Sequence, residues 1–94
     1  MPKIQLKPQF VANPLRPKDK PKVDYFDTQL AGFMLEVRQT GKATYYLRYR
    51  DKNGKLRQVR IGAPETMSLD EARSTAMALK SQAVIGFDPK GDLS

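Results

Sequence analysis

The chain has 94 residues, of which 17 are Lys or Arg and 10 are Asp or Glu, so its formal net charge at pH 7 is +7. This length predicts one small domain with a modest core, and the charge favours an acidic polymer, most often a nucleic acid, as the partner. The sequence contains no Cys and no His, which excludes disulfides, thiolate metal sites and His-activated nucleophiles, and no apolar run is long enough for a membrane span or a signal peptide.

Residues 1–24 are predicted to form an extended basic arm. Five of the seven prolines lie here and alternate with Lys and Arg, a composition that favours extended, poorly packed chain. Two interpretations stay open: an arm that lies along DNA phosphates or enters a groove, and a solvated tail that awaits another domain. Four apolar residues of the arm have no predicted docking site: Ile4, Leu6, Phe10 and Val11.

Residues 25–32 lead from the arm into the domain. Asp27 with Thr28 predicts a local side-chain-to-backbone turn, and Gly32 predicts a backbone position with unusual torsion angles. Tyr25 and Phe26 either cap an open end of the core or add a short strand. Both interpretations are structural, and neither assigns these residues to binding.

Three antiparallel strands are predicted at about residues 33–39, 43–50 and 55–61, because apolar and polar residues alternate with period two between Gly-bearing corners. One face of this sheet is apolar and carries Phe33, Leu35, Val37, Tyr45, Leu47, Tyr49, Val59 and Ile61. The opposite face is basic and carries Met34, Glu36, Arg38, Thr44, Tyr46, Arg48, Arg50, Leu56, Gln58 and Arg60. Positions 33–61 hold eight Lys or Arg residues and two acids, so most of the excess charge belongs to the sheet.

The register of the strands depends on the two corners. A three-residue loop over residues 40–42, with Gly41 in the left-handed conformation, keeps the two faces separate. It pairs Val37 with Tyr45, Leu35 with Leu47 and Phe33 with Tyr49. At the second corner a two-residue turn at 53–54 would place Tyr49 opposite Gln58 and mix the faces, so an odd-numbered loop or a bulge is expected there.

A helix is predicted over residues 69–85. Ser68 and Glu71 form a capping box at its start, and Gly86 with Pro89 ends it. Apolar residues recur along it at helical spacing and form a stripe that packs on the apolar face of the sheet: Leu69, Ala72, Ala76, Leu79 and Ala83. The expected fold class is therefore α+β, a three-stranded antiparallel sheet packed on one C-terminal helix with an extended basic N-terminal arm. The domain covers 25–88, and a linker starts at 89–94.

No catalytic constellation is present in the sequence. The neighbouring acids Asp70 and Glu71 are explained by helix capping, and Tyr45 and Tyr49 fall on the apolar face. We therefore expect no enzymatic activity of this chain, no metal and no cofactor.

Several segments resemble, in order and spacing, the amino-terminal domain of phage and prophage tyrosine-recombinase integrases, over about residues 18–89. These segments are Tyr25 to Phe33, Leu35 to Arg38, Tyr46 to Arg50, Arg60 to Gly62, Ser68 to Arg73 and Gly86 to Pro89. The resemblance implies a three-stranded sheet on one helix that binds arm-type attachment sites, followed in the full-length protein by core-binding and catalytic domains. It also implies other integrase domains and protomers as partners, a role in DNA integration and excision, and a location in the bacterial host cytoplasm. The arm before Pro21 departs from the family pattern.

The basic face predicts a major-groove interface, because that groove admits a ribbon of strands and displays a distinct pattern for each base pair. Arg48 and Arg60 are candidates for guanine edges, and Gln58 suits adenine. Other contacts of the face are assigned to Arg38, and to Thr44 and Tyr46 at thymine methyl groups or the backbone. Phosphate contacts near strand ends are assigned to Lys42, Arg50, Lys55 and Arg57.

Two other functions stay open. RNA or single-stranded nucleic acid would need aromatic stacking platforms, and only Tyr46 is placed on the basic face. A protein-interaction module would need an apolar surface patch, and Met34 and Leu56 are the only apolar residues expected there. Salt dependence separates these functions from duplex DNA binding, because neutralising about five phosphates predicts a log–log slope near −4.5.

Overall fold

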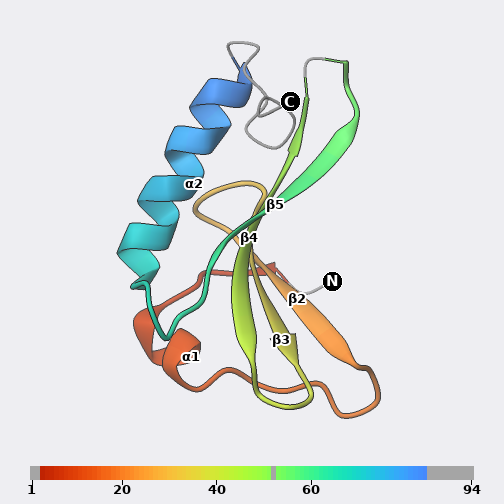
Figure 1. Ribbon diagram of the computed structural model, residues 1–94. Helices are drawn as coiled ribbons and strands as arrows, with labels where there is room; N and C mark the ends of the chain where they lie inside the picture. Colours follow the sequence, from red (N-terminus) through yellow and green to blue (C-terminus); the bar gives the residue numbers. More distant parts are fainter. Residues whose placement is uncertain (1–2, 52, 85–94) are drawn as a thin grey trace.

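The computed structural model describes residues 3–51 and 53–84. The elements in chain order are β1 (Lys3–Ile4), α1 (Pro8–Ala12), β2 (Lys22–Asp27), β3 (Phe33–Arg38), β4 (Ala43–Arg50), β5 (Leu56–Gly62) and α2 (Leu69–Val84). The strands form one sheet in the order β1-β2-β3-β4-β5. β1 and β2 are parallel and the other neighbours are antiparallel. Figure 1 shows α2 lying along one face of this sheet, with α1 near the start of α2.

The sheet has five strands, not the three that were predicted, although the α+β class and the C-terminal helix are confirmed. β2 is the larger omission. Its residues alternate like those of the other strands: Val23 pairs with Val37 and Tyr25 with Leu35 on the helix side. The alternating stretch is short and follows a Pro- and Lys-rich segment. The composition of that segment therefore led to the prediction of an extended arm, although the alternation was present in the sequence.

The N-terminal segment packs on the domain and is not an extended arm. Leu6 is 1% exposed and Val11 is 8% exposed, and both belong to the core cluster. Phe10 meets Tyr25 edge to face, with 4.9 Å between ring centroids. Pro8 begins α1, a position where its missing N–H costs no helical hydrogen bond. Burial of these apolar side chains therefore orders a segment whose composition alone favours extended chain.

The Asp27 carboxylate joins three segments of the chain. It accepts hydrogen bonds from the Leu6 N–H at 3.1 Å and from Arg73 Nε and Nη2 of α2 at 3.0 and 3.2 Å. Arg73 Nη2 also donates to the Leu6 carbonyl at 2.8 Å. The predicted local turn at this residue is therefore replaced by a buried ion pair between β2 and α2, with the backbone after β1 included.

The β3–β4 and β4–β5 hairpins each use a three-residue loop that ends in a glycine with positive φ. Gly41 has φ of 94° and Gly54 has φ of 78°. In the first hairpin the Arg38 N–H donates to the Lys42 carbonyl and the Gly41 N–H donates to the Arg38 carbonyl. In the second, Asp51 makes the same two bonds with Lys55 and Gly54. This pattern is that of a turn followed by a bulge residue in the left-handed region.

The first loop has the predicted length but spans residues 39–41 instead of 40–42, because Gly41 is its last residue and not its middle one. The predicted register is therefore wrong by two residues. The pairs are Phe33 with Leu47, Leu35 with Tyr45 and Val37 with Ala43. A shift of two residues leaves every side chain on its predicted face. At the second corner Tyr49 pairs with Arg57 and not with Gln58, as expected for an odd-numbered loop, and an irregularity follows where the partner of Tyr45 is Gly62.

The start of α2 agrees with the predicted capping box. The Ser68 N–H donates to Glu71 Oε1 at 3.1 Å, and the Glu71 N–H donates to Ser68 Oγ at 3.2 Å. Leu69, Ala72 and Ala76 are buried against the sheet. The predicted helix end at 85, Gly86, Pro89 and the linker lie outside the described residues. In the part of the chain that the structure describes, no helix is long and apolar enough to cross a membrane.

Candidate nucleic-acid interface

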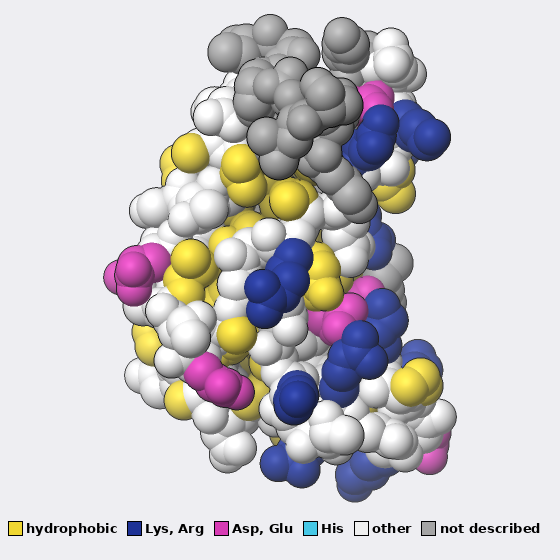
Figure 2. All heavy atoms as spheres, viewed as in Figure 1, with side chains coloured by type: hydrophobic (Ala, Val, Ile, Leu, Met, Phe, Trp, Pro, Cys, Tyr) yellow, Lys and Arg dark blue, Asp and Glu magenta, His cyan; other side chains and the backbone are white. Residues whose placement is uncertain are grey.

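The side of the sheet away from α2, called here the open face, carries most of the strand cations. Its side chains come from four strands: Lys22, Asp24 and Phe26 of β2, Met34, Glu36 and Arg38 of β3, Thr44, Tyr46, Arg48 and Arg50 of β4, and Leu56, Gln58 and Arg60 of β5. These residues include five cations and two acids. In Figure 2 the dark-blue side chains gather mainly on the side of the molecule opposite α2.

Cross-strand pairing brings seven of the ten predicted site residues together on this face, with Arg50 opposite Leu56 at the β4–β5 end. Tyr46 pairs with Arg60, and Arg48 pairs with Gln58. Thr44 pairs with Glu36, whose carboxylate is held by Arg38. The groups that read or contact DNA in the predicted interface are therefore neighbours, as the alternation indicated.

Arg50 lies at one end of the open face, Lys42 and Lys55 lie beside the face at the two hairpin ends, and all three are exposed. Lys42 follows the β3–β4 loop, and Arg50 donates from Nη1 to the Gly54 carbonyl of the β4–β5 loop at 3.0 Å. β4 has eight residues, so the two hairpin ends are roughly 25 Å apart. This separation exceeds the major-groove width of about 12 Å.

Arg57 is the one predicted site residue that the structure places on the helix side of the sheet. It pairs with Tyr49, and its Nε lies 3.0 Å from Asp51 Oδ2. The same carboxylate accepts the backbone N–H groups of Asn53 and Lys55, each at 2.9 Å. The Lys55 N–H, with Arg57 and Asn53, lowers the pKa of Asp51 below its ordinary value. Arg57 therefore braces the β4–β5 turn. Arg57 is two residues from Val59 on the same strand, so the alternation in the sequence already indicated that it faces the helix side.

Of the two acidic residues on the open face, Glu36 is buried and paired with cations, and one carboxylate oxygen of Asp24 is buried. The Glu36 side chain is 4% exposed, and its carboxylate lies 3.1 Å from Lys22 Nζ and 3.3 Å from Arg38 Nε. Asp24 pairs with Glu36 across the strands. Within the described residues its Oδ1 atom is buried without a hydrogen-bond partner. The cations therefore dominate what the open face presents to solvent.

Arg48 is held between an aromatic ring and an amide. Its Cζ atom lies 5.2 Å from the centroid of the Phe26 ring, within the range of a cation–π contact. Its Nε and Nη2 atoms lie 3.3 and 3.0 Å from Gln58 Oε1. Sequence reasoning did not assign Phe26 or Lys22 to the site. The alternation of Lys22, Asp24 and Phe26 on one side of β2 is the signal that would have found them.

The segment before β2 is fastened to the β3–β4 hairpin. The Gln39 side chain donates to the Lys18 carbonyl at 2.9 Å, and its backbone N–H donates to the Pro21 carbonyl at 3.1 Å. The Arg16 guanidinium packs so closely on Gly41 that a β-carbon there would lie 2.7 Å from it. Arg16 is therefore held beside the β3–β4 hairpin, and Lys22 pairs with Arg38 across the strands.

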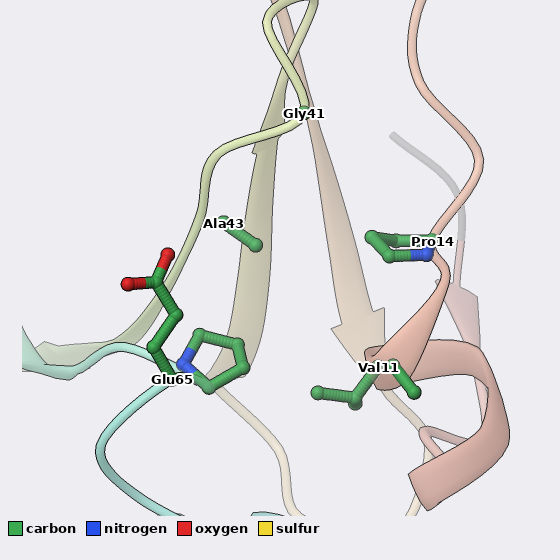
Figure 3. Close-up of a pocket in the computed structure, with 7 residues that line it drawn as sticks. Val11, Pro14, Gly41, Ala43 and Glu65 are labelled. Carbon is green, nitrogen blue, oxygen red and sulfur yellow. The ribbon is translucent and has the colours of Figure 1, made fainter.

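A hollow of about 270 Å³ lies on the other side of the molecule, where α1, the β3–β4 hairpin and the β5–α2 loop meet. Figure 3 shows Val11, Pro14 and Ala43 around it, with Glu65 as its labelled carboxylate. One carboxylate among hydrocarbon side chains offers no acid–base pair. Across residues 3–51 and 53–84, no group of three or more His, Cys, Asp or Glu residues is placed to hold a metal ion.

Comparison with known proteins identifies the module. A family model described as an arm DNA-binding domain matches residues 6–93. No curated protein matches the chain. The matched range begins at Leu6, the first residue of the N-terminal segment that is buried in the core. The chain belongs to the arm DNA-binding domain family, which is found in phage integrases, and it is a DNA-binding module without a catalytic role of its own.

Proposed function

We propose that the open face binds double-stranded DNA in the major groove at arm-type attachment sites. The chain would then be the N-terminal domain of a phage or prophage tyrosine recombinase that integrates and excises DNA in the bacterial cytoplasm, alongside other integrase domains and protomers. The observation that supports this proposal is the open face itself, which α2 leaves uncovered and on which four strands place five cations. The major groove is the groove of B-DNA that is wide enough for strands.

The contacts divide by position. Arg48 of β4 and Arg60 of β5 lie between the two hairpin ends and are proposed to reach guanine edges, while Thr44 and Tyr46 contact thymine methyl groups or the backbone. Phosphate contacts are proposed at the two hairpin ends, because clusters roughly 25 Å apart can meet the backbones on both sides of one groove. Lys42 and Arg38 serve one end, and Arg50 and Lys55 serve the other. Arg57 is left out, because it is engaged with Asp51 on the helix side.

The other two candidate functions have less support. A single-strand binder stacks bases on open aromatic faces, and Arg48 lies over the Phe26 ring. A protein-interaction surface would use apolar area, but Met34 is fully buried, and among the described residues of the open face Leu56 is the one exposed large apolar side chain.

A chemical-shift titration tests the proposal. The protein is titrated with a duplex selected from a randomised library and with a scrambled duplex, each at two salt concentrations. Shifts concentrated on Arg38, Tyr46 and Arg60, with tighter binding of the selected duplex, are expected. Shifts on α1 and α2 alone, or equal affinity for the two duplexes, would contradict sequence readout by the open face.

Two alanine variants sharpen this test. Arg60→Ala removes an exposed cation from the open face and is expected to weaken binding of the selected duplex about tenfold or more. Lys7→Ala removes an exposed cation at the start of α1 and is the matched control, with affinity expected to stay within about twofold.

A further inference from the structure

The orientation of the Arg48 guanidinium is fixed from two sides. Phe26 lies under it at 5.2 Å, and Gln58 Oε1 accepts from both Nε and Nη2. Phe26 belongs to β2 and Gln58 to β5, so residues from strands on both sides of β4 contact one side chain of β4. Arginines at exposed sites lose rotamer entropy when they bind, and a side chain held beforehand loses less.

A glycine permits this arrangement. Gly32 accepts the Arg48 N–H through its carbonyl at 2.8 Å, which places it opposite Arg48 across the β3–β4 pairing. It has no side chain to stand between Arg48 and Phe26. Its φ of 89° and the contact that a β-carbon would make with the Arg48 carbonyl oxygen both require glycine. A hollow of about 370 Å³ lies beside Arg48 here and is lined in part by Phe26, Gly32 and Leu56.

The hydrogen bonds from Arg48 to Gln58 determine which N–H groups of the Arg48 guanidinium remain for a ligand. A guanidinium has five N–H groups, and one on Nε and one on Nη2 point to Gln58. Within the described residues Nη1 makes no hydrogen bond. The Nη1–Nη2 edge therefore keeps two parallel donors, the arrangement that matches guanine O6 and N7.

The same bonds limit Gln58. Bidentate contact with adenine needs the amide oxygen as an acceptor and the amide nitrogen as a donor. A carbonyl oxygen has two lone pairs, and Arg48 already supplies two donors to Gln58 Oε1. Gln58 is therefore better suited to orient Arg48 than to read a base.

We infer that Phe26 and Gln58 are positioning residues that hold Arg48 with its Nη1–Nη2 edge available, and that Arg48 reads one guanine of the bound duplex. This inference rests on the proposed function, because it needs the open face to enter the major groove. It assigns a role to Phe26, a residue outside the predicted site, and it replaces adenine reading by Gln58 with a role that acts through Arg48.

The test starts from duplexes selected with the unmodified protein from a library with a randomised central segment. Arg48→Ala identifies the guanine whose preference depends on Arg48. At that position 7-deazaguanine, which lacks the N7 acceptor, is substituted, and the ratio of the two dissociation constants is measured for each variant. The unmodified protein is expected to bind the 7-deazaguanine duplex roughly tenfold more weakly.

Phe26→Leu and Gln58→Leu are each expected to reduce this ratio to about twofold, while Phe26→Tyr, which keeps the aromatic ring, restores it. The matched control is Phe10→Leu, the same substitution at a ring that packs on Tyr25 away from the open face. Its ratio should equal that of the unmodified protein. Gln58→Leu keeps the test decisive if Phe26→Leu fails to fold.

The outcomes separate the inference from the proposed function. If the unmodified protein selects no preferred sequence, the proposed function fails and this inference fails with it. If it selects a guanine that Arg48 reads, but both Phe26→Leu and Gln58→Leu leave the 7-deazaguanine ratio unchanged, the inference alone is overturned. An adenine preference that depends on Gln58 and not on Arg48 would overturn it as well.

Discussion

Asp27 and Arg73 are the residues on which the attachment of the N-terminal segment depends. The Asp27 side chain is fully buried and that of Arg73 is 18% exposed. Asp27→Asn removes the charge and leaves Arg73 without its partner in a largely dry site. Loss of one member of such a pair costs about 3 kcal/mol of the free energy of unfolding, measured by urea denaturation. Asp19→Asn, at an exposed position, is the control and should change it by less than about 0.5 kcal/mol. Equal effects of the two substitutions would show that the ion pair does not hold the segment.

Tyr45 has a buried hydroxyl with no hydrogen-bond partner among the described residues. Tyr45→Phe is expected to leave the free energy of unfolding unchanged or to raise it by up to about 1 kcal/mol, because the unpaired hydroxyl is removed and the ring keeps its place. The ring itself is stacked with Phe33, with 5.6 Å between centroids. Tyr45→Ala, which removes it, should cost about 3 kcal/mol or more.

The same residue gives a pH dependence. Burial raises the pKa of Tyr45 above its ordinary value of 10.0, and the charge of Arg73 offsets part of this increase. An unfolded chain therefore releases this proton at a lower pH than the folded protein does. The contribution of the protonated Tyr45 phenol to the free energy of unfolding is complete below pH 10 and is lost as the pH rises through the pKa of Tyr45 in the folded protein. Tyr45→Phe should remove this part of the alkaline loss, whereas Tyr46→Phe, at a half-buried position on the open face, should leave it in place.

At the scale of an element, the β4–β5 hairpin depends on Asp51. Its carboxylate accepts from Asn53, Lys55 and Arg57, and the Lys55 N–H contributes most to the lowered pKa. A lowered pKa stabilises the folded state above the unfolded pKa and loses this contribution as the pH falls through the folded value. Asp51→Asn should therefore reduce stability at pH 7 and have less effect at pH 3, measured as unfolding free energies at both values. A difference that does not shrink in acid would assign the loss to geometry and not to charge.

The elements that sequence reasoning predicted correctly are those with local signals. The β3, β4 and β5 strands show alternation over six to eight residues, and the capping box marks the start of α2. β1 has two residues and no pattern of its own. The docking of Leu6 and Val11 depends on an apolar surface that the rest of the chain creates, so the local sequence around these two residues does not predict their burial.

The candidate site was predictable to the same extent. Parity along the strands placed Arg38, Arg48 and Arg60 on one face, and the two-residue register error left this unchanged. Arg57 was predicted to contact phosphate because it is near a strand end, although the alternation along the strand placed it on the core side of the sheet. The contact between Arg48 and Phe26 joins β4 to β2 across β3, and sequence reasoning missed it because β2 had not been recognised as a strand.

At the scale of the whole molecule, the N-terminal segment is part of the fold. Leu6→Ala and Leu15→Ala are the same substitution nine positions apart in this segment, at side chains that are 1% and 70% exposed. Leu6→Ala is expected to lower the free energy of unfolding by about 2–5 kcal/mol, because it opens a cavity in the core. Leu15→Ala should stay within about 0.5 kcal/mol. Thermal or urea unfolding checks both, and a small effect of Leu6→Ala would mean that the stability of the domain does not depend on the docking of this segment.

The charge distribution over the whole molecule predicts how DNA affinity changes with salt. If about five phosphates are neutralised, the log of the association constant should fall with the log of salt concentration with a slope near −4.5. Because the proposed phosphate contacts lie at both hairpin ends, Lys42→Ala and Lys55→Ala should each make the slope less steep by about 0.9, and their effects should add. Lys7→Ala, which removes an exposed lysine at the start of α1, should leave the slope unchanged. Equal effects of all three substitutions would indicate a diffuse attraction with no defined footprint, whereas an effect at one hairpin only would restrict the contact to a single backbone of the duplex. Additive losses at the two ends, with no change from Lys7→Ala, are what a sheet lying in the groove between two phosphate backbones requires.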